Sequence, residues 1–130
     1  MKFPEELSYT ESHEWLKKTE DGKVIVGITD FAQHQLGDIV YVDYMIQNGQ
    51  DLQKGDPYAE IESVKAVESS FMPISGKILE INGGLEEKYD LINSSPYGDG
   101  WLIKVAPSKT DELSSLLNHE QYKQLTAELE

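Results

Sequence analysis

The sequence AEIESVKAVES, residues 59–69, is the stretch from which the fold of the chain can be inferred. Its first arm alternates between two sets of side chains, which predicts a strand with one buried face. One side carries Ala59, Ile61 and Ser63, and the other carries Tyr58, Glu60 and Glu62. Residues 66–72 predict a second strand, which Pro73 limits. The stretch therefore predicts a strand, a turn and a second strand.

The turn between these strands contains Val64 and Lys65 but none of the Asn-Gly or Asp-Gly pairs that tight hairpins prefer. A lysine at the tip of such a turn is a mild conflict between local sequence and structure, and such conflicts tend to mark functional sites. The small neighbours Ser63 and Ala66 leave the amine accessible to another protein. The simpler interpretation is an ordinary exposed lysine in a turn.

Composition narrows the classes of function. The chain has 130 residues, a formal net charge of -13, no arginine and no cysteine. An acidic chain without arginine is poorly suited to bind nucleic acid or an anionic membrane surface. Without cysteine it can form no disulfide, thiolate zinc site or cysteine nucleophile. Any sulfur chemistry therefore requires a prosthetic group. The acidity itself fits either plain solubility or attraction to basic partner surfaces.

Short strands and turns fill the N-terminal half. Residues 15–18 and 24–28 predict strands joined by a turn at residues 20–22, where Asp-Gly favours a hairpin. Asp30 occupies a candidate N-cap position for a short helix over residues 31–36, and Gly37 is a candidate stop. Residues 38–44 predict the next strand.

A near-repeat flanks the lysine hairpin. Residues 48–56 and 82–90 both contain Asn-Gly followed by leucine, lysine and aspartate at similar spacing, which suggests an internal two-fold relationship. Chance similarity between turns is the alternative, because turns use few residue types. Residues 73–81 predict a turn and a strand in which Gly76 fits a bulge or bend. Residues 91–100 predict a turn-rich loop, and residues 101–105 a final strand.

The C-terminal tail, residues 110–129, predicts helix. Thr110 is a candidate N-cap for residues 111–117. Asn118 is a candidate cap for a second segment, with Gln121 at the capping-box position. In that segment Tyr122, Leu125 and Leu129 share one face, which predicts packing onto the sheet, with an exposed partner-binding helix as the alternative.

Several motifs resemble one family. "ESVKAV" and "PISGKILEIN" resemble the lysine hairpin of biotinyl and lipoyl domains. "SHEW", "VGITDFAQ" and "LINSSPYGDGWLIKV" resemble, more narrowly, the glycine cleavage system H-protein family, and the match extends over about residues 9–117. The resemblance implies a mostly β, lipoyl-domain-like flattened barrel or sandwich of two small sheets with internal pseudo-two-fold symmetry. We expect one domain over residues 1–130, with its core at about 9–106.

The resemblance also implies a function. In this family the "ESVKA" lysine, here Lys65, carries lipoate as N6-lipoyl-lysine. The family is a carrier and not an enzyme. It takes an aminomethyl group from glycine decarboxylase (P protein) to aminomethyltransferase (T protein), and dihydrolipoyl dehydrogenase (L protein) reoxidises the arm. A lipoate ligase or a lipoyl/octanoyl transferase attaches the cofactor. We expect a monomer that binds no metal, nucleic acid or membrane.

The family resemblance places three further residues near the arm. Ser12, Glu14 and Leu36 are expected to line a cleft that shelters the loaded arm from water, with Glu14 facing its ammonium group. The alternative for Glu14 is a surface charge on a strand edge. One departure concerns the acid after the lysine, because Glu68-Ser69 stands where many relatives have Ser-Asp. On a strand that shift would turn the acid to the other face.

Other functions remain open at this point. An H-like protein that donates lipoyl groups to other enzymes is the alternative within the family. An enzyme that uses Lys65 as a Schiff base or general base is disfavoured, since Glu60, Glu62 and Glu68 would raise the lysine pKa. A purely structural domain is a further alternative. The first residues lack both a signal-peptide core and an arginine-rich transit sequence. We expect a cytoplasmic protein in a bacterium or a mitochondrial matrix protein in a processed eukaryotic form.

Overall fold

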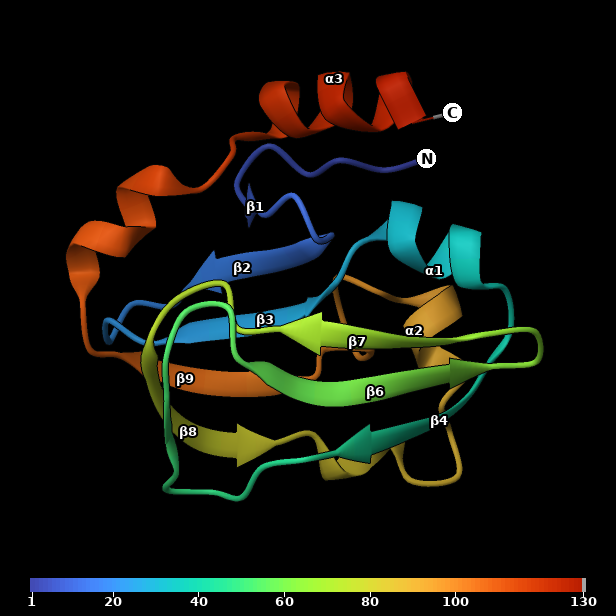
Figure 1. Ribbon diagram of the computed structural model, residues 1–130, viewed down its shortest axis with the longest axis horizontal. Helices are drawn as coiled ribbons and strands as arrows, with labels where there is room; N and C mark the ends of the chain where they lie inside the picture. Colours follow the sequence, from blue (N-terminus) through green and yellow to red (C-terminus); the bar gives the residue numbers. More distant parts are fainter. Residues whose placement is uncertain (130) are drawn as a thin grey trace.

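Two antiparallel sheets form the body of the molecule (Figure 1), in a computed structural model that describes residues 1–129. The larger sheet has six strands in the order β1-β2-β3-β9-β8-β5. Their bounds are Ser8–Tyr9, Glu14–Lys18, Val24–Ile28, Ile103–Pro107, Gly76–Ile81 and Asp51–Leu52. The smaller sheet has the order β4-β6-β7, with bounds Ile39–Tyr44, Pro57–Ser63 and Val67–Phe71. The expected fold of two small sheets is confirmed.

The helices are short. They are α1 (Asp30–Leu36), α2 (Leu91–Ser94) and α3 (His119–Leu129), with 3-10 turns η1 (Gly83–Leu85) and η2 (Thr110–Ser115). α1 and α2 lie at the end of the sheets where the β6–β7 hairpin turns, and α3 lies across the N-terminal segment (Figure 1). None of the helices within residues 1–129 combines the length and apolar character that crossing a membrane requires.

The hairpin of β6 and β7 confirms the two predicted strands, but one side chain of β6 is not on the predicted face. Ala59 and Ile61 are buried, whereas Glu60 and Glu62 are partly exposed. Tyr58 is fully buried as well, although it was placed on the side of the glutamates. A register shift between β6 and β7 at Pro57/Ala59 interrupts the alternation, so that Tyr58 and Ala59 can both turn inward.

The cap of α1 is one residue earlier than predicted. The Thr29 side chain accepts a hydrogen bond from the Ala32 backbone N–H over 3.1 Å, and Asp30 is the first helical residue. Threonine and aspartate are both good N-caps, so the sequence does not separate them. Gly37 ends the helix with φ 81°, as expected from its position.

Three predictions for the C-terminal half were wrong in detail. The segment 91–100 is not only a loop, because its first four residues form α2. The last strand runs over Ile103–Pro107 rather than 101–105. Thr110 does not cap an α-helix; η2 follows Lys109 without a side-chain cap, and Leu117 pairs with Tyr9 through backbone hydrogen bonds of 2.8 Å.

The near-repeat takes two different local forms. Residues 48–56 contain strand β5 and a turn, whereas residues 82–90 contain η1 and turns. Similar sequences therefore have different hydrogen-bonding partners here: β5 pairs with β8, and the Asn82 side chain caps η1 by accepting from the Gly84 N–H.

Two clusters of buried side chains fill the interior. The larger lies between the sheets and includes Val26, Ile61, Ile78 and Leu102. The smaller contains Leu7, Tyr9, Trp15 and Tyr122 and joins α3 to the N-terminal segment. The predicted face of α3 is therefore buried in part against β1 and its surroundings, while Leu129 at its end is exposed.

Candidate functional site

Lys65 lies at the exposed tip of the β6–β7 hairpin. The Ser63 N–H donates to the Ala66 carbonyl over 2.8 Å. The Ser63 hydroxyl oxygen accepts from the N–H groups of Lys65 and Ala66 at 3.2 and 3.0 Å. These bonds take the place of Asn-Gly chemistry, since serine side chains bond to nearby backbone groups in turns. Ser63 was interpreted only as a small neighbour, and its capping role was missed.

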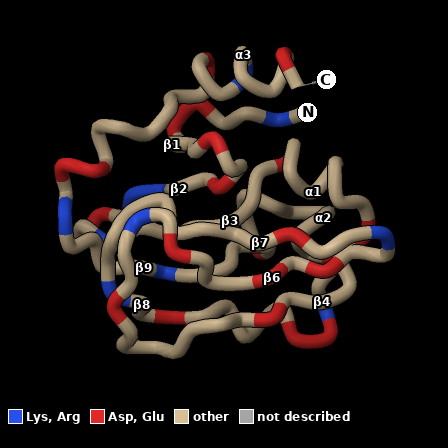
Figure 2. Tube along the Cα trace, in the orientation of Figure 1, with Lys and Arg blue, Asp and Glu red and all other residues tan. Residues whose placement is uncertain are grey.

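The hairpin tip is also anchored from outside. The Val64 N–H donates to the Asp38 carbonyl over 3.0 Å, just before β4 begins. Figure 2 shows a basic position at the turn between β6 and β7, where Lys65 lies, and acidic positions along both strands. The amine is therefore presented on a fixed turn within an acidic surface.

A groove of about 500 Å³ begins beside this tip. A Cβ atom built on Gly37 would lie 3.7 Å from Lys65 Cε, so the lysine stem passes close to the end of α1. Apolar side chains on the groove wall are Ile28, Phe31, Ala32, Leu36, Ile61, Ala66 and Leu129. Polar side chains on it are Ser12, His13, Glu14, Gln35, Glu68, Ser69 and Ser70. The tertiary structure thus brings Ser12, Glu14 and Leu36 to one groove near Lys65.

Glu14 is buried on this groove, with 1% of its surface exposed, and is not a surface charge on a strand edge. The hydroxyls of Thr10 and Ser12 donate to its Oε1 over 2.6 and 2.5 Å. The Phe71 N–H and the Ser70 hydroxyl donate to its Oε2 over 3.1 and 3.3 Å. All four partners are donors, which is the arrangement that an ionised carboxylate needs.

Burial raises the pKa of Glu14 above its ordinary value, although the hydrogen bonds from Ser12, Thr10, Phe71 and Ser70 act in the opposite direction. None of these four partners carries a positive charge. Neither ion pair found within residues 1–129, Lys104–Glu80 and His119–Glu120, involves a groove residue. No positively charged side chain therefore neutralises Glu14 among its hydrogen-bond partners.

A tight turn presents Ser12 and Glu14. The His13 N–H donates to the Thr10 carbonyl over 3.1 Å, and His13 has φ 74°, which is uncommon outside glycine. The His13 carbonyl accepts from the Thr29 N–H over 3.0 Å. This bond ties the turn to the start of α1, and burial lowers the pKa of the His13 imidazole.

Register explains where Glu68 lies. Glu68 pairs with Ile61, and Ser69 pairs with Glu60, in an interval of the ladder without a register shift. Directly paired residues of antiparallel strands point to the same face, so Glu68 shares the face of buried Ile61. The displaced acid therefore lies toward the groove, and both Glu68 and Ser69 line it. As expected from the one-residue shift, Glu68 and Ser69 lie on opposite faces of β7.

Sequence reasoning missed several residues of the groove. His13, Phe31, Ser70 and Leu129 all line it. His13 belongs to the SHEW motif and Phe31 to VGITDFAQ, so membership of these motifs was the available signal. Ser70 and Leu129 had none, because they reach the groove from a second sheet and from the C-terminal helix. Within residues 1–129 no group of three or more metal-ligating side chains forms a metal site.

The geometry can be compared with known proteins. The family model described as "Glycine cleavage H-protein" matches residues 7–129. A glycine cleavage system H protein of Oceanobacillus iheyensis is 47% identical over 122 residues, covering 94% of this chain and 95% of that protein. One from Bacteroides fragilis is 46% identical over 123 residues, covering 95% and 96%.

A solved structure is similar as well. The crystal structure of a glycine cleavage system H protein from Mycobacterium marinum superposes with a TM-score of 0.84 at 35% sequence identity. The match covers 95% of this chain and 98% of that one. Sequence and backbone therefore agree over nearly the whole chain.

Proposed function

The chain belongs to the glycine cleavage H-protein family, and on this premise we propose that it is a non-catalytic carrier with lipoate attached to Lys65 as N6-lipoyl-lysine. Its cargo would be the aminomethyl group that the P protein produces and the T protein consumes, with the L protein restoring the oxidised arm. A lipoate ligase or a lipoyl/octanoyl transferase would attach the cofactor. The carrier would be a monomer.

One observation carries the proposal: Lys65 stands on a hydrogen-bonded tip beside a groove whose polar end is Glu14. A carrier lysine must be reachable by several enzymes, which an exposed tip allows. A carrier must also hold its cargo between encounters, and the groove offers a place for it. An isolated surface lysine would meet only the first requirement.

The residues of the groove suit lipoate. The apolar wall from Leu36 to Ile28 matches a hydrocarbon chain, and the carboxylate of Glu14 matches a cationic end. When bound, the cofactor supplies a dithiolane whose sulfurs undergo the redox and group-transfer chemistry. The chain itself, which has no cysteine, has no thiol for that chemistry.

The roles of the individual residues follow from their contacts. Lys65 would form the amide bond to the cofactor, because its amine is exposed on a fixed turn. Glu14 would hold the ammonium of the cargo, oriented by hydroxyl and backbone donors that keep its oxygens in place. Ser12 would hold Glu14 Oε1 in place. Leu36 would cover the hydrocarbon part of the lipoyl arm and exclude water from it.

The experiment that tests this proposal is modification of the folded protein. Incubation with a lipoate ligase, lipoate and ATP is followed by intact and peptide mass measurement, with Lys65→Arg as the variant. Lys54→Arg is the matched control, since Lys54 is another exposed lysine in a turn, with an N–H bonded to Ser75 Oγ at 2.9 Å. We expect one lipoyl mass on the Lys65 peptide of the wild type and of the control, and none on Lys65→Arg.

A second step separates the carrier from a lipoyl donor. Lipoylated protein is mixed with glycine decarboxylase, and exchange of labelled bicarbonate into glycine is followed. Exchange that depends on Lys65 supports the carrier function. Lipoylation without exchange would favour the donor, and a folded protein that takes no lipoate would overturn the proposal.

A further inference from the structure

The C-terminal helix α3 is joined to the groove through one buried hydroxyl. The Tyr122 side chain is fully buried, and its hydroxyl lies 2.9 Å from His13 Nδ1 and 2.6 Å from Thr29 Oγ1. His13 lines the groove, and Thr29 caps α1, whose Phe31 and Leu36 form the groove wall. A single side chain of α3 thus contacts two of the elements that line the groove.

The same two partners are linked through the backbone. The Thr29 N–H donates to the His13 carbonyl over 3.0 Å, and His13 holds the positive φ of the turn that carries Ser12 and Glu14. A non-glycine residue keeps such a conformation only where its surroundings determine it. The Tyr122 hydroxyl and its ring, whose centroid lies 5.8 Å from the imidazole centroid in an edge-on arrangement, provide part of those surroundings.

The start of α3 fixes where Tyr122 lies. The Asn118 N–H donates to Gln121 Oε1, and the Gln121 N–H donates to Asn118 Oδ1, both over 2.9 Å. This is the predicted capping box, and Tyr122 follows it directly. The Tyr122 ring stacks on Tyr9 at a centroid distance of 4.6 Å. The capping box and the stacked tyrosines therefore fix the first turn of α3.

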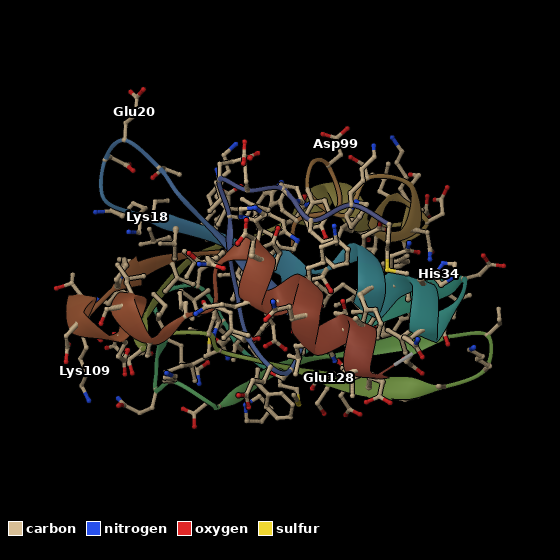
Figure 3. The ribbon with its side chains drawn as sticks, turned by 90° about the horizontal axis from the view of Figure 1, so that it is seen from above. Lys18, Glu20, His34, Asp99, Lys109 and Glu128 are labelled. Atoms are coloured by element: carbon tan, nitrogen blue, oxygen red, sulfur yellow. The ribbon has the colours of Figure 1, made fainter. Side chains whose placement is uncertain are left out.

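The other end of α3 reaches the groove itself. Leu129 lines the groove together with Phe31, Ala66 and Glu68, although 56% of its own surface is exposed. Figure 3 shows the end of α3, labelled at Glu128, lying over the space between α1 and the β6–β7 hairpin. An exposed leucine at the rim of an apolar groove gains burial when a ligand occupies the groove.

We propose that α3 is part of the arm-binding groove, with Tyr122 as a positioning residue for the turn of Ser12 and Glu14 and Leu129 as a contact for the docked arm. This inference rests on the proposed carrier function. It predicts that α3 controls how long the loaded arm stays protected from water, although no residue of α3 belongs to the motifs around Lys65.

Tyr122→Phe is the first variant, and Tyr9→Phe is its matched control. Both changes remove one hydroxyl from the same stacked pair, but among residues 1–129 the Tyr9 hydroxyl bonds to the Pro4 carbonyl alone, over 2.6 Å. In the unmodified protein we expect the amides of His13, Glu14 and Thr29 to exchange hydrogen at least about two-fold faster in Tyr122→Phe, because the change removes the hydrogen bonds of the hydroxyl to both His13 and Thr29. Tyr9→Phe should leave these rates unchanged.

Leu129→Gln is the second variant, with Glu128→Gln as its control, so that the same residue is introduced at neighbouring positions. After loading, release of the aminomethyl group is followed by mass spectrometry in all four variants. We expect faster release in Tyr122→Phe and Leu129→Gln and the wild-type rate in Tyr9→Phe and Glu128→Gln. Urea unfolding measures whether each variant and its matched control have the same free energy of unfolding.

Equal exchange in the two tyrosine variants, or equal release in the two glutamine variants, would overturn the inference. If Tyr122→Phe does not fold, His13→Asn takes its place, because asparagine tolerates positive φ and removes the imidazole from the network. The proposed function fails separately, through absence of lipoylation at Lys65. The exchange measurement needs no cofactor and still tests α3 in that case.

Discussion

The Phe71 backbone N–H donates a hydrogen bond of 3.1 Å to Glu14 Oε2, and this bond connects the two sheets. Phe71 ends β7, which begins two residues after Lys65, and Glu14 begins β2 of the other sheet. The acceptor of the groove is thus fixed to the strand that carries the lysine hairpin. The distance between attachment point and acceptor is set by one strand and does not depend on a flexible loop.

Glu14 should make stability depend on pH in a defined direction. Burial raises its pKa above the ordinary 4.5, so the folded protein binds this proton more tightly than the unfolded chain. The stabilising contribution of the protonated group is complete below the unfolded pKa and is lost as pH rises through the folded pKa. We expect the free energy of unfolding of Glu14→Gln, minus that of the wild type, to increase with pH across this window.

Urea unfolding at a series of pH values from below 4.5 to neutral measures this difference for Glu14. His13 titrates in both proteins, so its contribution cancels. A difference that does not change with pH would mean that the hydrogen bonds to the carboxylate fully compensate its burial.

Glu68 should help to retain a cationic cargo. Its side chain lies on the groove face of β7, whereas Glu62 pairs with Val67 on the other face. Exposed charge pairs contribute about 0.2–1 kcal/mol, so Glu68→Gln should release the aminomethyl group about 1.4- to five-fold faster at low salt. Glu62→Gln is the control and should retain the wild-type rate. Equal rates in both variants would assign retention to Glu14 alone.

Ser63 should determine how well the hairpin tip presents Lys65. Replacement by alanine removes the acceptor for the Lys65 and Ala66 N–H groups and should cost about 0.5–1.5 kcal/mol of stability. A less ordered tip should also lower kcat/KM of the lipoate ligase for this protein. Ser69→Ala, an exposed serine on β7 of the same hairpin, should change stability by less than about 0.5 kcal/mol. A ligase that does not distinguish the two variants would exclude the tip as a recognition element.

Glycine is required at position 76 because the backbone of β8 lies close to β9 there, and not because the strand bends. A Cβ atom there would lie 2.4 Å from the Ala106 carbonyl oxygen and 2.5 Å from Val105 Cγ1. Gly76→Ala should therefore lower the free energy of unfolding by about 1–3 kcal/mol. Gly83→Ala is the control, because a Cβ on Gly83 meets nothing within 4 Å. Urea unfolding of both variants is the measurement, and equal stability would show that β8 and β9 can separate at no cost.

Much of the local structure could be predicted from residue patterns. The hairpin at Asp21-Gly22, the arms around Lys65 and the capping box of α3 follow from interactions between residues within four positions of each other. Errors occurred where two local solutions have similar energies, as between Thr29 and Asp30 for the cap of α1. They also occurred where a register shift changed the alternation, as at Tyr58.

The sequence by itself determined the family, the mostly β fold and the lysine at the hairpin tip, because these depend on short-range periodicity and on motifs of consecutive residues. Only the tertiary structure decided that Glu14 is buried, that Glu68 faces the groove and that α3 reaches the groove through Tyr122 and Leu129. The physical reason is distance along the chain. Tyr122 and His13 are 109 residues apart along the chain, and only the tertiary fold brings them together.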